Sequence, residues 1–253
     1  VHWLLLLTLG WPFAVLWSVA VLYATLGFRQ FSHHFTDIRD ALDAGDEAQA
    51  RQLLAQWRQT DVGELSRREI VRQVIEQSVL SAHRHVFGVL AWFSILAAFG
   101  LGPAGAVLYR LTEFAARYWP HVSQRQGQPV SEAARAAASQ AWHWVDWLPA
   151  RITALGFAVV GSFEDAIDSW RSHEAQLDAS NDGVILAATA GAVNVRLGAQ
   201  APVVGLEEEV EAPSTTRQEP ELAHLRSIVG LVWRSVVMWM LLLALLTLAR
   251  LLG

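Results

Sequence analysis

Three long apolar stretches dominate the pattern of hydrophobic and polar positions along the chain. Residues 3–28 and 86–108 carry no charged side chain, and residues 231–248 carry only Arg234, near their start. A helix needs about 20 apolar residues to span a bilayer. We therefore predict spanning helices at residues 3–28 and 231–248. Because proline suits the first turn of a helix, an alternative start for the first of them is Pro12.

The stretch at residues 86–108 is interrupted by Gly100 and by the sequence Gly-Pro-Ala-Gly at residues 102–105. Proline has no amide proton and glycine tolerates positive φ, so a straight helix is unfavourable there. Inside a bilayer an irregular turn needs protein or water around it. The pattern predicts two helical arms that meet at a tight break and dip into or cross the membrane, with polar residues at both outer ends, 76–85 and 109–117.

The segment after the first apolar stretch has the polar character of a water-exposed region. Apolar residues recur at helical spacing over residues 37–44 and 47–57. Gly45 suits the left-handed end of the first helix and Asp46 suits the N-cap of the second, which predicts an αα-hairpin. A third helix, capped by Ser66, should lead directly into the polar segment that precedes the broken pair.

The second half of the chain has two further dense segments. Ser131 should cap a helix through residue 141, and a new helix should start near Pro149. The uncharged run that follows Arg151 is short for a span, so a half-helix, a re-entrant arm or a buried helix are all open. Small residues within 184–195 permit close helix packing, whereas residues 205–220 are typical of an exposed mobile loop.

These elements predict an all-α fold: a polytopic integral membrane protein with broken or re-entrant helices and a small extramembrane helical hairpin. We expect a single membrane domain over residues 1–253. Within it we expect an extramembrane helical segment at 29–84, a mobile loop at 199–224 and a C-terminal transmembrane helix at 226–252. The sequence begins with Val1 and enters an apolar run almost at once, so we expect an N-terminal part to be missing.

Composition supports membrane residence. The chain is 53% hydrophobic and 17% charged, whereas soluble domains carry about 25% charged residues. The net charge of −5, with no dense arginine cluster, argues against a nucleic-acid-binding protein. All basic side chains other than histidine are arginines, and the absence of cysteine excludes disulfides, thiolate metal sites and thiol nucleophiles. No metal site is predicted from the sequence.

A few polar residues next to the apolar stretches are candidates for a catalytic or binding role. Glu76 and His83 fall on one face of the third predicted helix, where they could pair, bind a cation or serve as base and acid. The alternative is a solvated helix end at the membrane interface. For Arg110 and Arg151 the alternative to substrate binding is snorkelling, or pairing with Glu113 and Asp146.

Several segments, taken in order, resemble the CobD/CbiB family of cobalamin biosynthesis and the related AmpE proteins. The resemblance rests on five stretches that together cover most of the chain from Glu76 to Gly198: residues 75–76, 87–89, 102–110, 146–154 and 182–198. The positions that match the family pattern are Glu76, Gly105, Tyr109, Arg110, Asp146, Pro149, Arg151, Asn181, Gly191 and Arg196.

For the enzymes of this family, the resemblance implies ATP-dependent amide formation between adenosylcobyric acid and an aminopropanol-type amine. Carried over to this sequence, it implies catalytic roles for Glu76, Asp146 and Arg151. Candidate substrate-binding residues are Tyr109, Arg110, Asn181, Arg196, His83 and His85. ATP and magnesium are the expected cofactors if the ligase activity is retained.

Two segments differ from the pattern of the enzymes, and the N-terminal Gly-Asp-Pro and Pro-His-Pro-Val segment of the family is not present in this sequence. The enzymes carry a sequence similar to Glu-Ser-x-x-Glu-Asn-x-x-Asp-Gly-Val, whereas this chain has His83, Arg84 and His85 in that segment. The enzymes continue Tyr-Arg-Ala-x-Asn-Thr-Leu-Asp, whereas here Tyr109-Arg110 is followed by Leu-Thr-Glu-Phe. Magnesium and phosphate chemistry uses carboxylates. The alternative is therefore a non-catalytic, AmpE-like regulatory or accessory membrane protein. A transport function, suggested by interrupted helices with ionisable ends, is a third hypothesis.

The expected location is a bacterial-type inner (plasma) membrane, crossed several times. The expected partners are the lipid bilayer, a corrinoid small molecule, and another membrane protein or a second copy of the chain. No nucleic acid is expected to bind.

Overall fold

The computed structural model describes residues 1–253 except 1–3, 5–6, 9, 59–62, 64, 121–122, 124–126, 128–129, 175–179, 199–216 and 253. At 28–32 and 249–252 the backbone alone is described. The described residues form helices and turns, with one isolated bridge between Val195 and Gln218 as their only extended pairing. This confirms the predicted all-α class.

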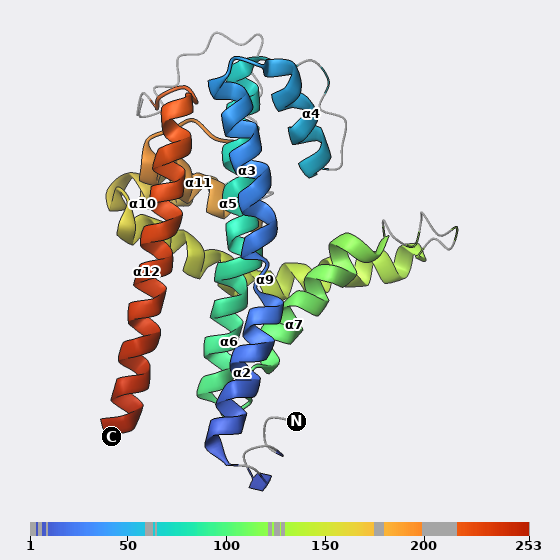
Figure 1. Cartoon of the computed structure of the whole chain (residues 1–253), viewed down its shortest axis with the longest axis vertical. Helices are drawn as coiled ribbons and strands as arrows, with labels where there is room; N and C mark the ends of the chain where they lie inside the picture. The colour runs from blue at the N-terminus through green and yellow to red at the C-terminus, as the bar shows by residue number, and fades with distance from the viewer. Residues whose placement is uncertain are drawn as a thin grey trace. The chain divides into compact units, whose positions relative to one another are not determined.

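The helices follow one another along the chain as shown in Figure 1. They are α2 Trp11–Thr25, α3 Phe28–Asp43, α4 Glu47–Arg58, α5 Arg67–Ala82, the π-helical turn η1 His83–Phe87, α6 Gly88–Ala98, α7 Ala104–Glu113, the π-helical turn η2 Phe114–Tyr118, α9 Glu132–Val160, α10 Phe163–Glu174, α11 Asn181–Val193 and α12 Leu222–Leu252.

Two compact units share these helices. Unit 1 comprises Val1–Ser32, Ser81–Thr153 and Val236–Gly253, and unit 2 comprises His33–Leu80 and Ala154–Ser235. The boundaries between them fall inside α3, α5, α9 and α12. Each unit has its own core: the core of unit 1 is built around Val89, Ala106, Tyr109 and Trp142, and a core cluster of unit 2 contains Ala154, Val184 and Ala188.

In unit 1 the predicted break separates α6 from α7. Gly100 and Gly102 have φ of 76° and 58°, and Pro103 is the N-cap of α7. The two arms then pack closely, because a Cβ on Gly105 would lie 2.0 Å from the carbonyl oxygen of Trp92. The broken helical pair is therefore confirmed, and Gly105 is what allows the arms to approach.

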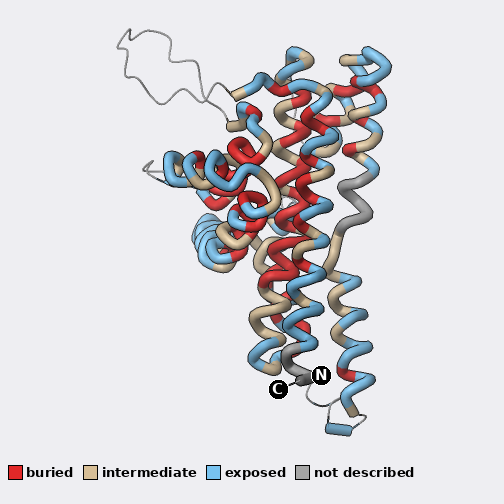
Figure 2. The backbone as a smooth tube through the Cα atoms, turned by 90° about the vertical axis from the view of Figure 1, so that its left-hand side faces the viewer, coloured by how far each residue is buried: buried red, intermediate tan, exposed pale blue. Residues whose placement is uncertain are grey.

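Helix α5 passes directly into η1 and α6, so that residues Arg67–Ala98 form one continuous helix. Its five-residue π-helical turn was not predicted from the sequence. Such turns contain an extra residue and are frequent at functional sites. In Figure 2, helix α2 is mainly pale blue, whereas red, buried residues follow much of this continuous helix.

In unit 2 the predicted hairpin is formed by α3 and α4. Gly45 has φ of 79°, and the Asp46 carboxylate accepts a hydrogen bond from the Gln49 amide at 2.9 Å. The start of the next helix, α5, is also as predicted, because the Ser66 hydroxyl accepts from the Glu69 amide at 3.3 Å. The first helix is longer than expected and begins at Phe28.

We expect Asp46→Ala to lower the free energy of unfolding by about 1 kcal/mol, since the first turn of α4 loses its cap. Far-UV circular dichroism during unfolding in detergent would measure the change. Asp46→Asn keeps an acceptor oxygen and should stay within a few tenths of a kcal/mol of the parent chain. Equal losses for both variants would show that the cap is not what stabilises the hairpin.

The predicted helix start at Pro149 is wrong. Pro149 lies inside α9, a 29-residue helix that runs from Glu132 to Val160 and is capped as expected by Ser131, whose hydroxyl accepts from the Ala134 amide. The short apolar run after Arg151 is thus the C-terminal part of a longer helix. Neighbouring helices can compensate for the hydrogen bond that a proline removes.

Helices α10 and α11 pack against each other in unit 2. Helix α10 was not predicted from the sequence. The expected close approach at the small residues of α11 is present, because a Cβ on Gly191 would lie 2.1 Å from the Asp165 carbonyl oxygen. This contact fixes the two helices that form a cavity in unit 2.

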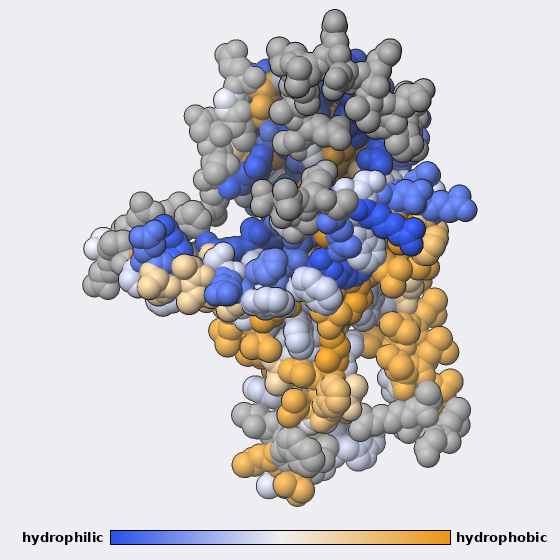
Figure 3. All heavy atoms as spheres, turned by 180° about the vertical axis from the view of Figure 1, so that it is seen from behind, coloured by the Kyte–Doolittle hydropathy of each residue, from blue (hydrophilic) through white to orange (hydrophobic). Residues whose placement is uncertain are grey.

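Two described helices, Arg67–Ala98 and Leu222–Leu248, are long and apolar enough to cross a membrane, as judged by length and composition. Helix α2 is a shorter apolar helix within the predicted span at 3–28. The apolar side chains of α12 form a hydrophobic column at the right of Figure 3. Helix α12 begins at Leu222, so the mobile loop predicted at 199–224 ends too late, and its residues 199–216 lie outside the described part of the chain.

Candidate functional site

A buried hydrogen-bond network in unit 1 joins three of the predicted site residues. His83 Nε2 lies 2.9 Å from Asp146 Oδ1, and the Tyr109 hydroxyl donates to the same oxygen at 2.8 Å. His83 Nδ1 lies 2.9 Å from the Thr153 hydroxyl. His83, Tyr109 and Asp146 have no exposed surface, so the predicted alternative of a solvated helix end does not describe His83.

Three helical segments bring this network together. His83 is the first residue of η1, Tyr109 comes from α7, and Asp146 and Thr153 come from α9. Gly88 makes room for the phenol, because a Cβ at that position would lie 2.2 Å from the Tyr109 hydroxyl. The Phe87-Gly88-Val89 segment of the family resemblance thus supplies the space into which Tyr109 fits.

The surroundings of Asp146 favour its ionised form. Burial raises the pKa of this carboxyl, but the hydrogen bonds from His83 and Tyr109 outweigh burial and hold the pKa below its usual value. The second carboxylate oxygen, Oδ2, is buried and has no hydrogen-bond partner in the part of the chain that the structure describes. An ionised Asp146 can only accept hydrogen bonds, so His83 must present a protonated Nε2 to it.

A second polar cluster in unit 1 contains His85, Arg110 and Glu113. The Arg110 guanidinium donates to His85 Nδ1 at 2.8 Å and also binds the Glu113 carboxylate. The pairing of Arg110 with Glu113 is the alternative that the sequence left open. His85 in turn lies against Gly27, where a Cβ would lie 3.1 Å from His85 Nδ1.

Arg151 does not pair with Asp146 in the way that the sequence allowed. Its guanidinium lies over the Trp147 ring, 4.2 Å from the ring centroid, and donates to the Trp147 carbonyl at 3.2 Å. Asp146 instead binds His83 and Tyr109. Two residues predicted to act together, Asp146 and Arg151, therefore have different partners.

Glu76, the third predicted catalytic residue, lies in unit 2. Its carboxylate accepts from the Arg72 guanidinium at 2.7 Å and from the Gly198 amide at 2.8 Å. Arg72 also binds Glu69. Glu76 and His83 thus have separate partners, although both lie on the same continuous helix.

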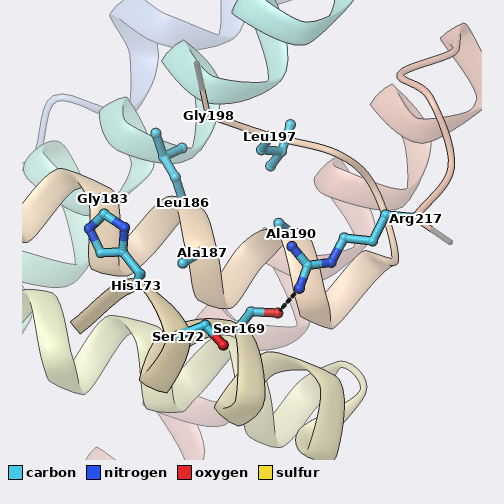
Figure 4. Close-up of a pocket in the computed structure, with 10 residues that line it drawn as sticks. All are labelled: Ser169, Ser172, His173, Gly183, Leu186, Ala187, Ala190, Leu197, Gly198 and Arg217. Atoms are coloured by element: carbon cyan, nitrogen blue, oxygen red, sulfur yellow. Dashed lines mark hydrogen bonds between the residues drawn. The ribbon is translucent and has the colours of Figure 1, made fainter. Parts of the chain in front are cut away.

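A cavity of about 230 Å³ opens between α10 and α11 in unit 2 (Figure 4). Its wall comes from α10, α11 and the segments on either side of residues 199–216. The lining residues are Ser169, Ser172, His173, Gly183, Leu186, Ala187, Ala190, Leu197, Gly198 and Arg217. Since Gly198 also binds Glu76, a predicted catalytic carboxylate is bonded to the wall of this cavity.

Two basic side chains reach this cavity from different directions. Arg217 extends across it and donates to the Ser169 hydroxyl, as the dashed line in Figure 4 shows. The imidazole of His173 lies against Gly183, where a Cβ would be 2.1 Å from His173 Nε2. That nitrogen is buried and, among the residues that the structure describes, has no hydrogen-bond partner.

The two remaining predicted residues lie close in sequence to this wall. Asn181 is a buried residue in the first turn of α11, where the Ser180 hydroxyl accepts from the Gly183 amide at 3.0 Å. Arg196 is more exposed and pairs with Glu219 at 2.8 Å, next to the bridge between Val195 and Gln218. These contacts hold both ends of α11 in place around the cavity.

The structure therefore groups the nine predicted residues into several sets. His83, Tyr109 and Asp146 share one network, His85 and Arg110 share a second, and Arg151 stands apart from both. In unit 2, Glu76, Asn181 and Arg196 lie on or next to the segments that surround the cavity. The sequence reasoning missed Ser169, His173 and Arg217, although the Ser-Trp-Arg-Ser-His run at 169–173 puts polar residues at helical spacing.

Among the described residues, no three histidine, aspartate or glutamate side chains are grouped so that they could hold a metal ion. Magnesium is commonly held by one or two carboxylates together with phosphates and water. The described residues thus offer single carboxylates, such as Glu76, and basic groups that suit phosphate oxygens.

Comparison with known proteins places the chain among relatives of one kind. A family model described as "CobD/Cbib protein" matches residues 1–232. "Cobalamin biosynthesis protein CobD" of Stutzerimonas stutzeri is 31% identical over 245 residues, which are 95% of this chain and 75% of that protein. The protein of the same name from Chromobacterium violaceum is 31% identical over 221 residues, covering 87% of this chain and 67% of the relative.

A more distant relative, "Cobalamin biosynthesis protein CobD" of Leptospira interrogans, is 28% identical over 195 residues. The match covers 75% of this chain but 59% of that protein. No solved structure matches the chain significantly.

Proposed function

This chain belongs to the CobD/CbiB family, and on that premise we propose that it forms the amide bond between adenosylcobyric acid and an aminopropanol-type amine. The relatives that match it over most of its length carry the name of cobalamin biosynthesis proteins. This favours an enzyme of that pathway over the AmpE-like accessory protein that the sequence left open. The AmpE hypothesis rested on the altered region from Glu76 to Gly88 and on the 12 tryptophans, and two residues of that region, His83 and His85, take part in polar clusters.

The observation that carries the proposal is the cavity of unit 2. One segment of the family resemblance, residues 182–198, borders it, and a second, at Glu76, is bonded to it through Gly198. Residues that are far apart in the sequence and belong to one motif set thus surround one small, largely polar space. A concave space on which several polar groups converge is the first candidate for a ligand site.

The chemistry of the reaction assigns a role to Glu76. Joining a carboxylate to an ammonium group releases one water, and ATP hydrolysis to ADP and phosphate takes up that water and drives the reaction. The amine must lose protons before it can attack a carbonyl carbon. We assign Glu76 to bind the ammonium group and accept a proton from it, because its carboxylate is held in place by Arg72 and Gly198.

The buried network of unit 1 receives a different role. Asp146, His83 and Tyr109 have no exposed surface, so we assign them to positioning rather than to contact with substrate. Arg110 and His85, which are half-buried, together with Arg151, Asn181 and Arg196, remain candidates for substrate binding. ATP supplies the activation of the carboxylate when it is bound, and the basic residues of the unit 2 cavity suit its phosphates.

We also propose that the chain is a multi-pass protein of a bacterial inner membrane. Two helices have the required length and apolar composition, and α2 adds a shorter apolar helix. Large apolar side chains are exposed on α2, α7 and α12, which suits lipid contact; examples are Trp11, Leu16, Leu111, Leu241 and Leu245. A second copy of the chain or another membrane protein could cover part of this surface.

The test is ligation by the detergent-purified full chain. Adenosylcobyric acid, aminopropanol and magnesium ATP are incubated with it, and the amide product is measured by mass spectrometry. We expect Glu76→Gln to lower the rate at least tenfold, because the carboxylate can no longer accept a proton. The matched control is Glu164→Gln, an exposed residue at the start of α10, which should leave the rate unchanged.

A folded parent chain that forms no amide under these conditions would refute the ligase proposal. Equal activity of the Glu76→Gln variant and the parent would instead refute the role of Glu76. Far-UV circular dichroism of each variant confirms that it is folded.

A further inference from the structure

The cavity of unit 2 contains two basic groups that the roles proposed above do not assign to particular atoms. We propose that this cavity is a binding subsite for a phosphate-type oxyanion, with Arg217 and His173 as the groups that hold it. The biological source of that oxyanion rests on the proposed ligation, whereas oxyanion binding itself can be tested without it.

Arg217 has the chemistry and the position of an anion ligand. Its guanidinium lines the cavity and donates to the Ser169 hydroxyl. Within the described part of the chain it is bonded to no carboxylate, in contrast to Arg196, which pairs with Glu219. A guanidinium has five N–H donors, so most of its donors remain available to oxygen atoms that enter the cavity.

His173 supplies the second donor. Its Nε2 is buried and has no hydrogen-bond partner among the described residues. Buried polar atoms of native proteins are nearly always bonded, so this nitrogen, which packs against Gly183 at the cavity wall, is a polar atom that the described residues leave unsatisfied. Like the guanidinium, an imidazole N–H can donate a hydrogen bond to an oxyanion.

The rest of the wall sets the size and the polarity of the ligand. Leu186, Ala187, Ala190 and Leu197 give one side an apolar lining, which strengthens the attraction between charges across the cavity. The two serines add short polar groups: Ser169 accepts from Arg217, and Ser172 donates to the Asp168 carbonyl at 2.8 Å.

The volume and the neighbouring charges agree with a small anionic group. About 230 Å³ is below the roughly 300–1,000 Å³ typical of sites for whole drug-sized molecules, so the cavity fits a phosphate-sized group of a larger ligand. The Glu76 carboxylate at the Gly198 edge pairs with Arg72, which also binds Glu69. Glu76 is therefore bonded to Arg72 rather than to Arg217, whose guanidinium binds Ser169.

The experiment measures binding of inorganic phosphate to the full chain in detergent by isothermal titration calorimetry. The parent chain should bind phosphate, and Arg217→Gln should weaken the affinity at least tenfold. Arg217→Lys keeps the charge and should weaken it less, and His173→Gln should weaken it severalfold. Arg226→Gln, which removes an exposed arginine from the same unit, is the matched control and should leave the affinity unchanged.

Two results would overturn the subsite: a folded parent chain that does not bind phosphate at millimolar concentrations, and equal affinities for the Arg217→Gln and Arg226→Gln variants. Circular dichroism confirms that each variant is folded. Because the side-chain hydrogen bond of Arg217 among the described residues is to Ser169, and its guanidinium pairs with no described carboxylate, the Arg217→Gln variant should fold.

A second arm identifies the source of the oxyanion. If the site holds the phosphates of a nucleotide, ATP binds, phosphate competes with it, and Arg217→Gln weakens both. If phosphate binds at Arg217 and ATP does not compete, the ligand is a phosphate group from another reactant, and the subsite stands. Failure of ligation with intact phosphate binding refutes the proposed function alone, and normal ligation with phosphate binding that is insensitive to Arg217 refutes the subsite alone.

Discussion

Replacing Asp146 by alanine should lower the free energy of unfolding by about 3 kcal/mol or more. The carboxylate oxygen Oδ1 accepts from both His83 and Tyr109, and all three side chains are fully buried. Its removal leaves an imidazole and a phenol without their acceptor where water cannot replace it. Breaking a buried pair by removing one partner typically costs 3–5 kcal/mol.

Unfolding of the purified chain, followed by far-UV circular dichroism in a series of denaturing detergent mixtures, would measure this loss. Asp146→Asn retains one acceptor oxygen and should lose less. Glu132→Gln, at the exposed first turn of the same helix, should change the stability by less than about 0.5 kcal/mol. A stability of Asp146→Ala equal to that of the Glu132 control would mean that the network contributes little.

The same variant should show a defined pH dependence. The pKa of Asp146 is lowered in the folded chain, so its contribution is present above the pKa of the unfolded chain and is lost as the pH falls through the folded value. The stability difference between parent and Asp146→Ala should therefore be constant near neutral pH and shrink in the acid range, below about pH 4. A difference that grows on acidification would contradict this assignment.

Replacing Gly105 by alanine should also be strongly destabilising, by about 3 kcal/mol. A Cβ at this position would lie 2.0 Å from the Trp92 carbonyl oxygen and 2.4 Å from its carbon. These are backbone atoms of α6, which cannot turn aside as a flexible side chain can. The methyl group would force α6 and α7 apart, and overpacking of this kind typically costs 1–3 kcal/mol and sometimes more.

Gly230 provides the matched control for this substitution. It lies within α12, and a Cβ there would meet no atom within 4 Å. Alanine is favoured over glycine inside a helix, so Gly230→Ala should raise the stability by about 0.5–1 kcal/mol. If both alanine variants change the stability equally, the contact between Gly105 and Trp92 is not as tight as described.

Local chemistry explains which elements could be predicted from the sequence. Asp46 and Ser66 cap helices because their short acceptors reach amides three residues ahead, and both act as expected. Pro103 follows two glycines with positive φ, Gly100 and Gly102, so the chain turns before α7 begins. Pro149 has no such glycine beside it, and its surroundings keep α9 helical through it. A proline alone therefore did not decide where a helix begins.

The candidate site was predicted only in part, for a related reason. Tyr109 and Asp146 were found through a family pattern. Their contact with each other and with His83 depends on the tertiary packing of α7 and α9 against η1, which the sequence pattern does not reveal. Neither the π-helical turn nor the cavity has a sequence signature that periodicity can detect. Arg217 and His173 line the same cavity only because α10 packs against α11.

The π-helical turn at His83–Phe87 sets the rotational phase of the helix that continues beyond it. Each residue of an α-helix advances the direction of its side chain by about 100°, so one residue more or fewer in this turn rotates every later side chain relative to His83. Gly88 would then no longer face Tyr109, and Trp92 would no longer donate to the Val145 carbonyl at 2.8 Å. The length of this segment is therefore constrained as well as its composition, because a single-residue deletion would misalign every later contact of the helix.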